Sequence, residues 1–357
     1  MLVAVSQVFS PSIPHTTLTM PAPKPQIEIW YGPRQRFGHL GRSNRWINIL
    51  GRVTAENEIY DLRWYLNEDA EPKPLPWGPT AYRLLGRGDF NIEIDPTRLR
   101  VGLNHIRVEA LDRAGRIGEA DVEVALHDPS DVPLPMRADF AAIEQLDEVA
   151  HVVDGHWRLT ESGVQPVEIG YDRVLTLGHL GWRDYEVTTS FTVHGYSEDP
   201  KAYHMPCCGT LVGLILRWQG HVDWHDLTPY RGYKPFGVLA LHLHRFKGVS
   251  RWAIYGNDDA LNPPDVPDRE IELDRRQWVK VRCVTRPGTT TRYDMKFWAD
   301  GDGEPERWCY GYDGLSDELP NGAVGLVAHQ TRATFHDVEI TPVDFADPLF
   351  PQPSAKP

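Results

Sequence analysis

The feature that most constrains this sequence is a recurring pattern of short runs in which apolar and polar residues alternate. Alternation with a period of two is typical of β-strands that bury one face. Turn residues separate the runs: the 357-residue chain contains 30 glycines and 30 prolines, which favour many turns over long helices. We therefore expect an all-β protein without a long helix.

The candidate strands fall into two groups. The first group consists of the runs 27–31, 45–53, 59–66, 82–85, 90–94, 104–111 and 118–126. The second group consists of the runs 157–160, 168–177, 185–194, 211–218, 237–245, 252–255, 270–273, 278–285, 291–298, 308–312, 323–329 and 333–340. Between them, the polar and proline-rich segment HDPSDVPLP at 127–135 indicates a linker.

This pattern predicts two β-sandwich domains, since a chain of this length can bury more than one core. The expected division is a disordered leader at 1–23, a sandwich at 24–128, a linker and lead-in at 129–150, a larger sandwich at 151–345 and a disordered tail at 346–357.

The composition of the chain argues against some classes of binding partner. The net charge of −13 is spread along the chain, which argues against nucleic acid. No segment approaches ~18 consecutive apolar residues, so we expect no membrane insertion. The first twenty residues lack the basic start of a signal peptide, and the true first residue is either Met1 or Met20. Four cysteines are too few for a disulfide framework. We expect a cytoplasmic protein, with secretion by another route left open.

The segment LNHIRVEALDRAGRIGEADVEVAL at 103–126 resembles the last hairpin of bacterial immunoglobulin-like and fibronectin type III-like modules. In those modules a D-x-x-G turn, here Asp112 to Gly115, reverses the chain between two alternating strands. The resemblance implies an immunoglobulin-like sandwich that serves as a spacer or a docking platform, including for self-association.

Four segments of the second group resemble the concanavalin A-like lectin/glucanase superfamily, including its laminin G-like jelly rolls. They are GYDRVLTLGHLGWRDYEVTTSFTVHG at 170–195, WVKVRCVTRPG at 278–288, YDMKFWADGDGEPERW at 293–308 and NGAVGLVAHQTRATFHDVEITPV at 321–343. The resemblance implies a jelly roll of two curved antiparallel sheets. It does not imply one activity, because the superfamily includes lectins, glycoside hydrolases, polysaccharide lyases and adhesion modules. The E-x-D-x-x-E strand of its retaining glucanases and the Q-I-H signature of its alginate lyases are both missing.

The stretch 210–245 is the leading site candidate, because two alternating runs flank a loop rich in His, Trp, Asp and Tyr. Alternation in the first run separates two faces of a strand. One face carries Val212, Leu214, Leu216 and Trp218, for which we expect burial, and the other carries Arg217 and Gln219.

In the second run, Leu239, Leu241 and Leu243 form an apolar face that we expect to line the core between the sheets. His242 and His244 would then project together to the opposite, ligand-binding side. The alternative is that both histidines are merely solvated on an outer sheet face.

Chemical roles follow if this face is catalytic. Arg217 would neutralise a uronate carboxylate or bind sugar hydroxyls. His242 or His244 would act as the base, and Tyr230 or Tyr255 as the acid, of a polysaccharide lyase. A glycoside hydrolase would instead need two carboxylates across the groove.

Aromatic residues supply candidates for ligand stacking, since sugar rings present apolar C–H faces to aromatic planes. Trp224, Tyr230 and Tyr233 lie among polar residues and are predicted to bind ligand. Asp226 and Gln219 would pair with its hydroxyls.

The run DGDGEPE at 300–306 is a candidate calcium loop. It places Asp300, Asp302 and Glu304 at alternate positions, as the first ligands of calcium loops are placed. The alternative is a solvated acidic turn, because the later bidentate glutamate of such loops is missing.

Three functions remain open from the sequence. The leading hypothesis is a lectin-like protein that binds an oligo- or polysaccharide on the concave face of the jelly roll, with no cofactor required and calcium as an option. The second is a polysaccharide lyase or glycoside hydrolase that uses the same face. The third is a structural or adhesion module of a larger assembly.

Overall fold

The computed structural model describes residues 23–80, 82–128, 132–198, 209–223, 231–232, 234–257, 261–262, 268–285, 290–315 and 318–343. Within these ranges the regular elements are strands, together with two short 3₁₀ turns, η1 (Pro96–Arg98) and η2 (Leu146–Glu148). The prediction of an all-β protein is confirmed. In the described part of the chain, no helix is long and apolar enough to cross a membrane.

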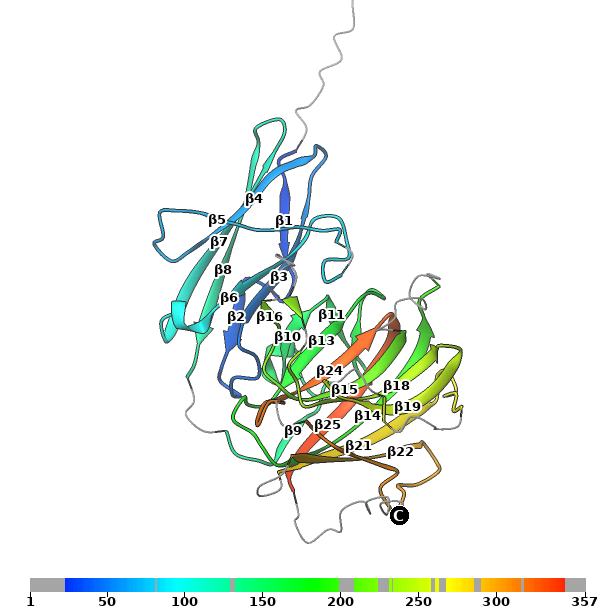
Figure 1. Cartoon of the computed structure of the whole chain (residues 1–357). Coiled ribbons are helices and arrows are strands. Elements are labelled where there is room, and N and C mark those ends of the chain that lie inside the picture. The colour runs from blue at the N-terminus through cyan, green and yellow to red at the C-terminus, as the bar shows by residue number, and fades with distance from the viewer. Residues whose placement is uncertain are drawn as a thin grey trace, which may run out of the picture.

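The N-terminal sandwich packs a three-stranded sheet against a five-stranded sheet (Figure 1). The smaller sheet has the order β1 (Gln26–Ile29), β3 (Ile47–Thr54) and β6 (Asp89–Ile94). The larger has the order β2 (Arg34–Phe37), β8 (Ile117–Leu126), β7 (Gly102–Asp112), β4 (Ile59–Leu66) and β5 (Lys73–Pro74). The pairing of β2 with β8 is parallel, and the other pairings are antiparallel.

The β7–β8 hairpin follows the alternation of its sequence. Ile106, Val108 and Ala110 are fully buried in the core of this sandwich, while the residues between them are more exposed. Asp112 closes the turn because its Oδ1 accepts hydrogen bonds from the backbone N–H groups of Ala114 and Arg116, each at 2.9 Å.

The second sandwich is of the jelly-roll class, with two antiparallel sheets face to face. The seven-stranded sheet has the order β10 (His151–Asp154), β13 (Arg173–Leu177), β24 (Ala323–His329), β15 (Thr210–Trp218), β18 (Val238–Phe246), β19 (Val249–Tyr255) and β20 (Leu261–Asn262). Seven strands of the eight-stranded sheet follow the order β11 (Trp157–Thr160), β12 (Gly163–Pro166), β25 (Thr331–Pro342), β14 (Tyr185–Tyr196), β21 (Arg276–Thr285), β22 (Thr291–Ala299) and β23 (Tyr310–Asp313), and the eighth strand is β9 (Met136–Ala138). The strand β9 pairs with β25, and β16 (Val222–Asp223) pairs with β17 (Arg231–Gly232).

The seven-stranded sheet buries apolar side chains on both of its faces. Its inner face packs against the eight-stranded sheet. There the rings of Trp252 and Phe297 stack with their centroids 4.6 Å apart. A second cluster that includes Leu241, Leu243 and Ile215 is buried apart from this core. In a sheet that is buried on both faces, each strand has apolar residues on both sides, so alternation in the sequence does not show which side faces the core.

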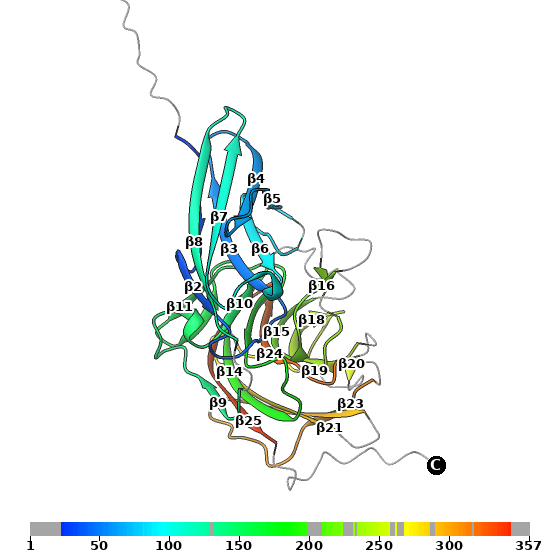
Figure 2. The same ribbon diagram turned by 90° about the vertical axis from the view of Figure 1, so that its left-hand side faces the viewer.

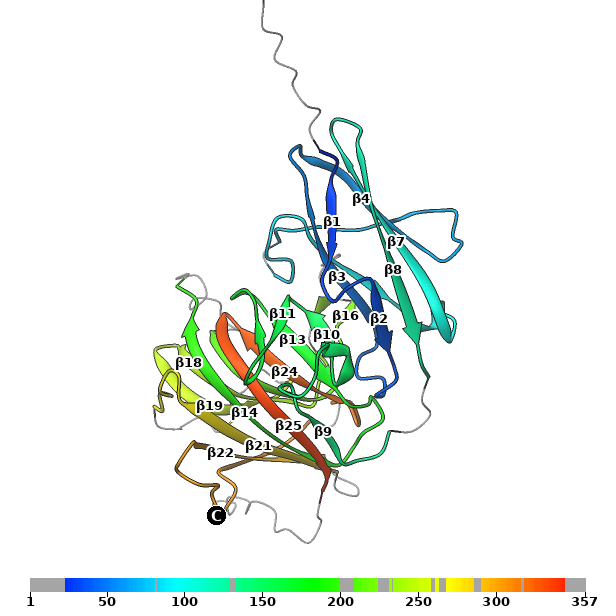
Figure 3. The same cartoon turned by 180° about the vertical axis from the view of Figure 1, so that it is seen from behind.

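The N-terminal sandwich lies against the end of the jelly roll that carries β10, β11 and β13 (Figures 1 and 2). The backbone N–H of Trp157, in β11, donates to the Tyr31 hydroxyl at 2.9 Å. Figure 3 shows from behind that β2 is the part of the larger N-terminal sheet nearest the jelly roll. The two sandwiches are joined by ion pairs between Arg83 and Asp154 (2.5 Å) and between Arg52 and Glu168 (3.1 Å). The Trp46 indole N–H also donates to the carbonyl of His221 at 2.7 Å.

Candidate functional site

The predicted cluster of Arg217, His242 and His244 does not form a ligand groove. Arg217 lies at a bulge of β15, where its φ of 50° shifts the register between Ile215 and Trp218. The bulge turns Trp218 to the face of Ile215, and Trp218 is fully buried as predicted. Arg217 itself is fully buried.

All three nitrogens of the Arg217 guanidinium bind groups of its own chain. It donates to the carbonyl of Arg183 (2.9 Å), to the hydroxyls of Thr291 (2.5 Å) and Thr285 (2.6 Å), and to Asp184 (3.3 Å). These partners belong to the eight-stranded sheet and to the segment before β14, so Arg217 ties the two sheets together. The prediction that it faces ligand is wrong.

The orientation predicted for β18 is also wrong. His242 is paired with Val212 and His244 with Thr210, and directly paired residues of antiparallel strands share a face. Val212 lies in the core between the sheets, so the histidines face inward and Leu241 faces outward.

Both histidines have internal partners. The Nε2 of His242 is 2.9 Å from the carbonyl of Arg269, and burial lowers the pKa of His242 to about 4. The His244 ring stacks on the Tyr196 ring with their centroids 3.7 Å apart, and the Nδ1 of His244 lies 3.2 Å from a carboxylate oxygen of Glu270. These contacts indicate structural roles for the two side chains.

The other predicted ligand-binding residues do not join this cluster. The Gln219 amide donates to the Asn321 side-chain oxygen at 2.8 Å. Tyr255 packs against the outward-facing apolar cluster, with the Lys234 ammonium 5.7 Å above its ring. Trp224, Asp226, Tyr230 and Tyr233 lie outside the described residues.

Two of the three carboxylates in the predicted calcium loop pair with cations of the same chain. Asp302 forms an ion pair with Arg275 at 3.0 Å, and Glu304 lies between Lys280 (2.9 Å) and Lys296 (2.6 Å). Asp300 accepts a bond from the Trp278 indole N–H at 3.4 Å. The described residues contain no group of three or more His, Cys, Asp or Glu side chains placed to hold a metal ion.

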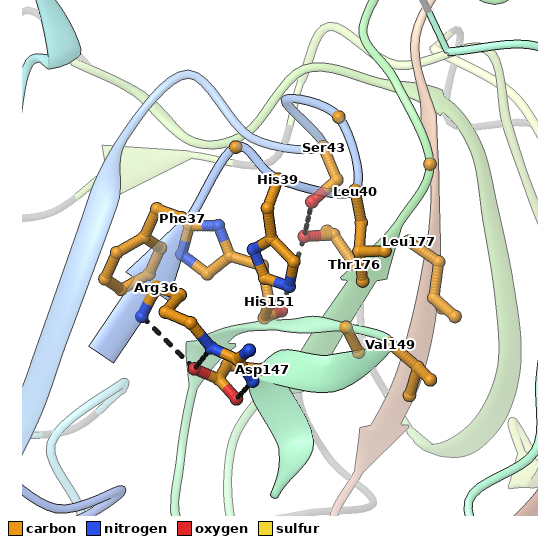
Figure 4. A pocket seen from close by; sticks show the side chains of 14 residues that line it. Arg36, Phe37, His39, Leu40, Ser43, Asp147, Val149, His151, Thr176 and Leu177 are labelled. Atoms are coloured by element: carbon orange, nitrogen blue, oxygen red, sulfur yellow. Dashed lines mark hydrogen bonds and ion pairs between the residues drawn. The ribbon is translucent and has the colours of Figure 1, made fainter. Parts of the chain in front are cut away.

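A different site lies between the two sandwiches, and we call it the interdomain hollow. Its small chamber, of about 30 Å³, is lined by residues 36–41 and Ser43 of the N-terminal sandwich and by Asp147, 149–151 and 176–178 of the jelly roll (Figure 4). A larger chamber, of about 250 Å³, adjoins it and shares Phe37 and His151. The larger chamber is completed by side chains of Asn44, Thr97, Leu99, Val101, Leu126 and His127.

The loop from Gly38 to Ser43, which follows β2, forms one wall of the small chamber, and β10 and β13 form the other (Figure 4). The hydroxyls of Ser43 and Thr176 lie 3.0 Å apart across the boundary. Arg36 and Asp147 close one side with two side-chain hydrogen bonds of 3.1 and 3.0 Å. This pairing neutralises the guanidinium at the mouth of the chamber.

Two histidines of the lining have ring nitrogens that no described residue binds. Both ring nitrogens of His39 and the Nε2 of His151 are buried and have no hydrogen-bond partner among the described residues. Burial lowers the pKa of His151 to about 3. Burial, reinforced by the charge of Arg36, also lowers the pKa of His39. Both imidazoles are therefore neutral at pH 7, and each offers one donor and one acceptor.

Sequence reasoning missed this site because its lining comes from separate parts of the chain. His39 lies in a loop of one sandwich and His151 at the edge of the other, with more than a hundred residues between them. No motif or spacing in the sequence connects them.

No protein-family model and no curated protein matches the sequence. Among solved structures, the Ca²⁺-bound exoplasmic/lumenal domain of VIP36 is 16% identical, covers 55% of this chain and 84% of that chain, and has a TM-score of 0.35. Alginate lyase Aly36B is 7% identical, covers 52% of this chain and 83% of that chain, and has a TM-score of 0.31. The endo-β-1,4-mannanase from Thermotoga petrophila is 11% identical over 30% of this chain, with a TM-score of 0.23, and the match spans 20% of the mannanase. At these TM-scores the likenesses carry no argument about function.

Proposed function

We propose that this protein binds carbohydrate and that a sugar residue occupies the interdomain hollow. The observation that carries the proposal is the set of three buried imidazole nitrogens, on His39 and His151, that lack a partner. Buried polar groups are normally hydrogen-bonded, and an unpaired one costs about 1–3 kcal/mol. A bound ligand that pairs with them would recover that cost.

The chemistry of the lining favours hydroxyl groups. A neutral imidazole presents a donor and an acceptor, and a hydroxyl group can satisfy either of them. The charged groups of the lining are matched in number, because Arg36 is paired with Asp147 and the larger chamber carries one arginine, Arg42, and one aspartate, Asp128. Phe37 and Leu99 line the larger chamber and offer apolar surface to the C–H face of a sugar ring.

The size of the larger chamber suits a short ligand. Its volume of about 250 Å³ lies just below the ~300–1,000 Å³ of pockets that hold drug-sized ligands. We therefore propose that a terminal sugar enters the hollow and that any longer glycan extends into solvent. The two aspartates among the lining residues belong to different chambers, and Asp147 is paired with Arg36, so binding is proposed in place of turnover.

The strand orders also support a finer assignment of the two domains. We infer an immunoglobulin-like N-terminal domain, because β1, β3 and β6 face a sheet in which the early strand β2 runs parallel to the last strand β8. We infer a concanavalin A-like second domain from its seven- and eight-stranded antiparallel sheets.

A glycan array followed by calorimetry on the strongest neutral hit tests the proposal. His39→Ala and His151→Ala should each weaken binding by at least about tenfold, because each removes imidazole nitrogens that would pair with the ligand. His105→Ala is the matched control, since His105 is exposed on β7. Neutral-glycan binding that both hollow variants retain at full strength would exclude this site.

A further inference from the structure

A second hollow, of about 410 Å³, lies on the N-terminal sandwich and has an exposed tryptophan in its wall. It is lined by the end of β3 and the start of β4 (53–55 and 57–59), by Trp77 to Pro79, and by Arg87 and Gly88. Among the contacts between described residues, none of the ion pairs or hydrogen bonds that join the two sandwiches involves this lining. This hollow is therefore separate from the interdomain hollow.

Close backbone packing fixes the position of Trp77. The N–H of Gly88 donates to the carbonyl of Gly78 at 3.0 Å, and the N–H of Val53 donates to the carbonyl of Gly88 at 2.9 Å. A Cβ on Gly88 would lie 2.0 Å from the Val53 oxygen, and the φ of Gly88 is +82°. The segment around Gly88 therefore packs closely against β3, and Trp77, which precedes Gly78, keeps 37% of its surface exposed.

The charges beside Trp77 are unbalanced. Glu58 is already paired with Arg113 at 2.5 Å. Arg87 is exposed and forms no hydrogen bond or ion pair with the described residues. Arg113 and, to a smaller extent, the charge of Arg87 lower the pKa of Glu58, which lines the same hollow, but no ion pair joins Glu58 to Arg87. The hollow therefore combines an exposed indole with a guanidinium that no described carboxylate binds directly.

We propose that Trp77 and Arg87 form a second binding site, for an acidic sugar residue of the uronate class. The indole would stack on the C–H face of the sugar ring, and the guanidinium would bind the carboxylate through two parallel hydrogen bonds. An acidic ligand complements Arg87, whereas the arginines that line the interdomain hollow are matched in number by the carboxylates of Asp147 and Asp128. The second site does not depend on the first.

Calorimetry on the full chain with a panel of oligouronates (galacturonate, glucuronate, mannuronate and guluronate trimers) tests this site. Trp77→Ala and Arg87→Gln should each weaken the best binder by at least about tenfold, whereas Trp77→Phe should retain most of the affinity. Arg34→Gln removes the same charge from an exposed position on β2 and should have no effect. His39→Ala should also have no effect, which separates this test from that of the interdomain hollow.

Two further probes set the ligand class. The methyl ester of the best oligouronate should bind at least about tenfold more weakly, because it lacks the carboxylate charge. Equal binding of the ester, equal binding of tetraglutamate, or the failure of every oligouronate to bind the wild-type chain would overturn the proposal. Thermal unfolding of each variant verifies that it is folded, as expected for substitutions at exposed side chains.

Discussion

Replacing Asp154 with asparagine tests how the two sandwiches are held together. Asp154 is 1% exposed. One carboxylate oxygen lies 2.5 Å from the Arg83 guanidinium of the N-terminal sandwich, and the other lies 2.6 Å from the ring of His221. Arg83 also binds Glu93 at 2.9 Å. Asp154 is thus the buried centre of a network that crosses the boundary.

The contribution of this network to the stability of the protein follows from the pKa of Asp154. Burial opposes ionisation of this carboxyl, but Arg83 and His221 lower its pKa from 3.8 to about 2. At 1.36 kcal/mol per pKa unit, this pairing contributes roughly 2 kcal/mol to the free energy of unfolding. Because the folded-state pKa is lowered, the contribution is complete above the unfolded pKa and is lost as the pH falls toward 2.

Asp154→Asn should lower the free energy of unfolding by more than the pairing of Asp154 contributes. Asp154→Asn removes the charge and leaves Arg83 and His221 buried with a weaker partner, and breaking a buried pair costs about 3–5 kcal/mol. Urea denaturation at pH 7, followed by tryptophan fluorescence, measures the loss. Asp61→Asn is the control, because Asp61 forms a more exposed pair with Arg63 at 3.6 Å and should leave the midpoint nearly unchanged. Equal midpoints for the two variants would refute this reasoning.

Three further predictions concern the interior. Arg217→Met should lower the free energy of unfolding by about 3–5 kcal/mol, because it leaves buried polar partners unpaired; a loss of glycan binding in the folded variant at unchanged stability would contradict its structural role. The pKa of His242 is lowered to about 4, so the stability that it supplies is present above about pH 6.5 and is lost as the pH falls to 4. Urea titrations across that range should show a shallower loss for His242→Gln than for the wild type. Gly88→Ala should lower the free energy of unfolding by more than about 3 kcal/mol, because its Cβ would lie 2.0 Å from a backbone oxygen. Gly115 has a similar φ of +79°, but a Cβ there would have nothing within 4 Å. Gly115→Ala should therefore lower the free energy of unfolding by only about 1 kcal/mol. Thermal melts that rank the two glycine variants equally would contradict the packing argument.

Some features were predictable because they depend on residues that are near one another in the sequence. The β7–β8 hairpin follows from its alternation and from the Asp112 turn. The long strands β21 and β22 were expected at 278–285 and 291–298, and they occupy Arg276–Thr285 and Thr291–Ala299. Burial of Trp218 was predictable in the same way, because the run around it is apolar.

The direction in which site residues face was decided by tertiary structure. Alternation assumes an unbroken strand, and the bulge at Arg217 reverses the two faces for the residues after it. It also assumes that one face of a sheet is apolar. The seven-stranded sheet buries apolar residues on both faces, so Leu241 faces outward while His242 lies in the core.

The all-β class and the positions of the long strands were thus determined by the sequence alone, because alternation and turn chemistry act over a few residues. The interdomain hollow was decided by the packing of one sandwich on the other. His39 and His151 come together only through contacts such as the buried Arg83–Asp154 pair. Such contacts join residues far apart in the chain, and no local pattern records them.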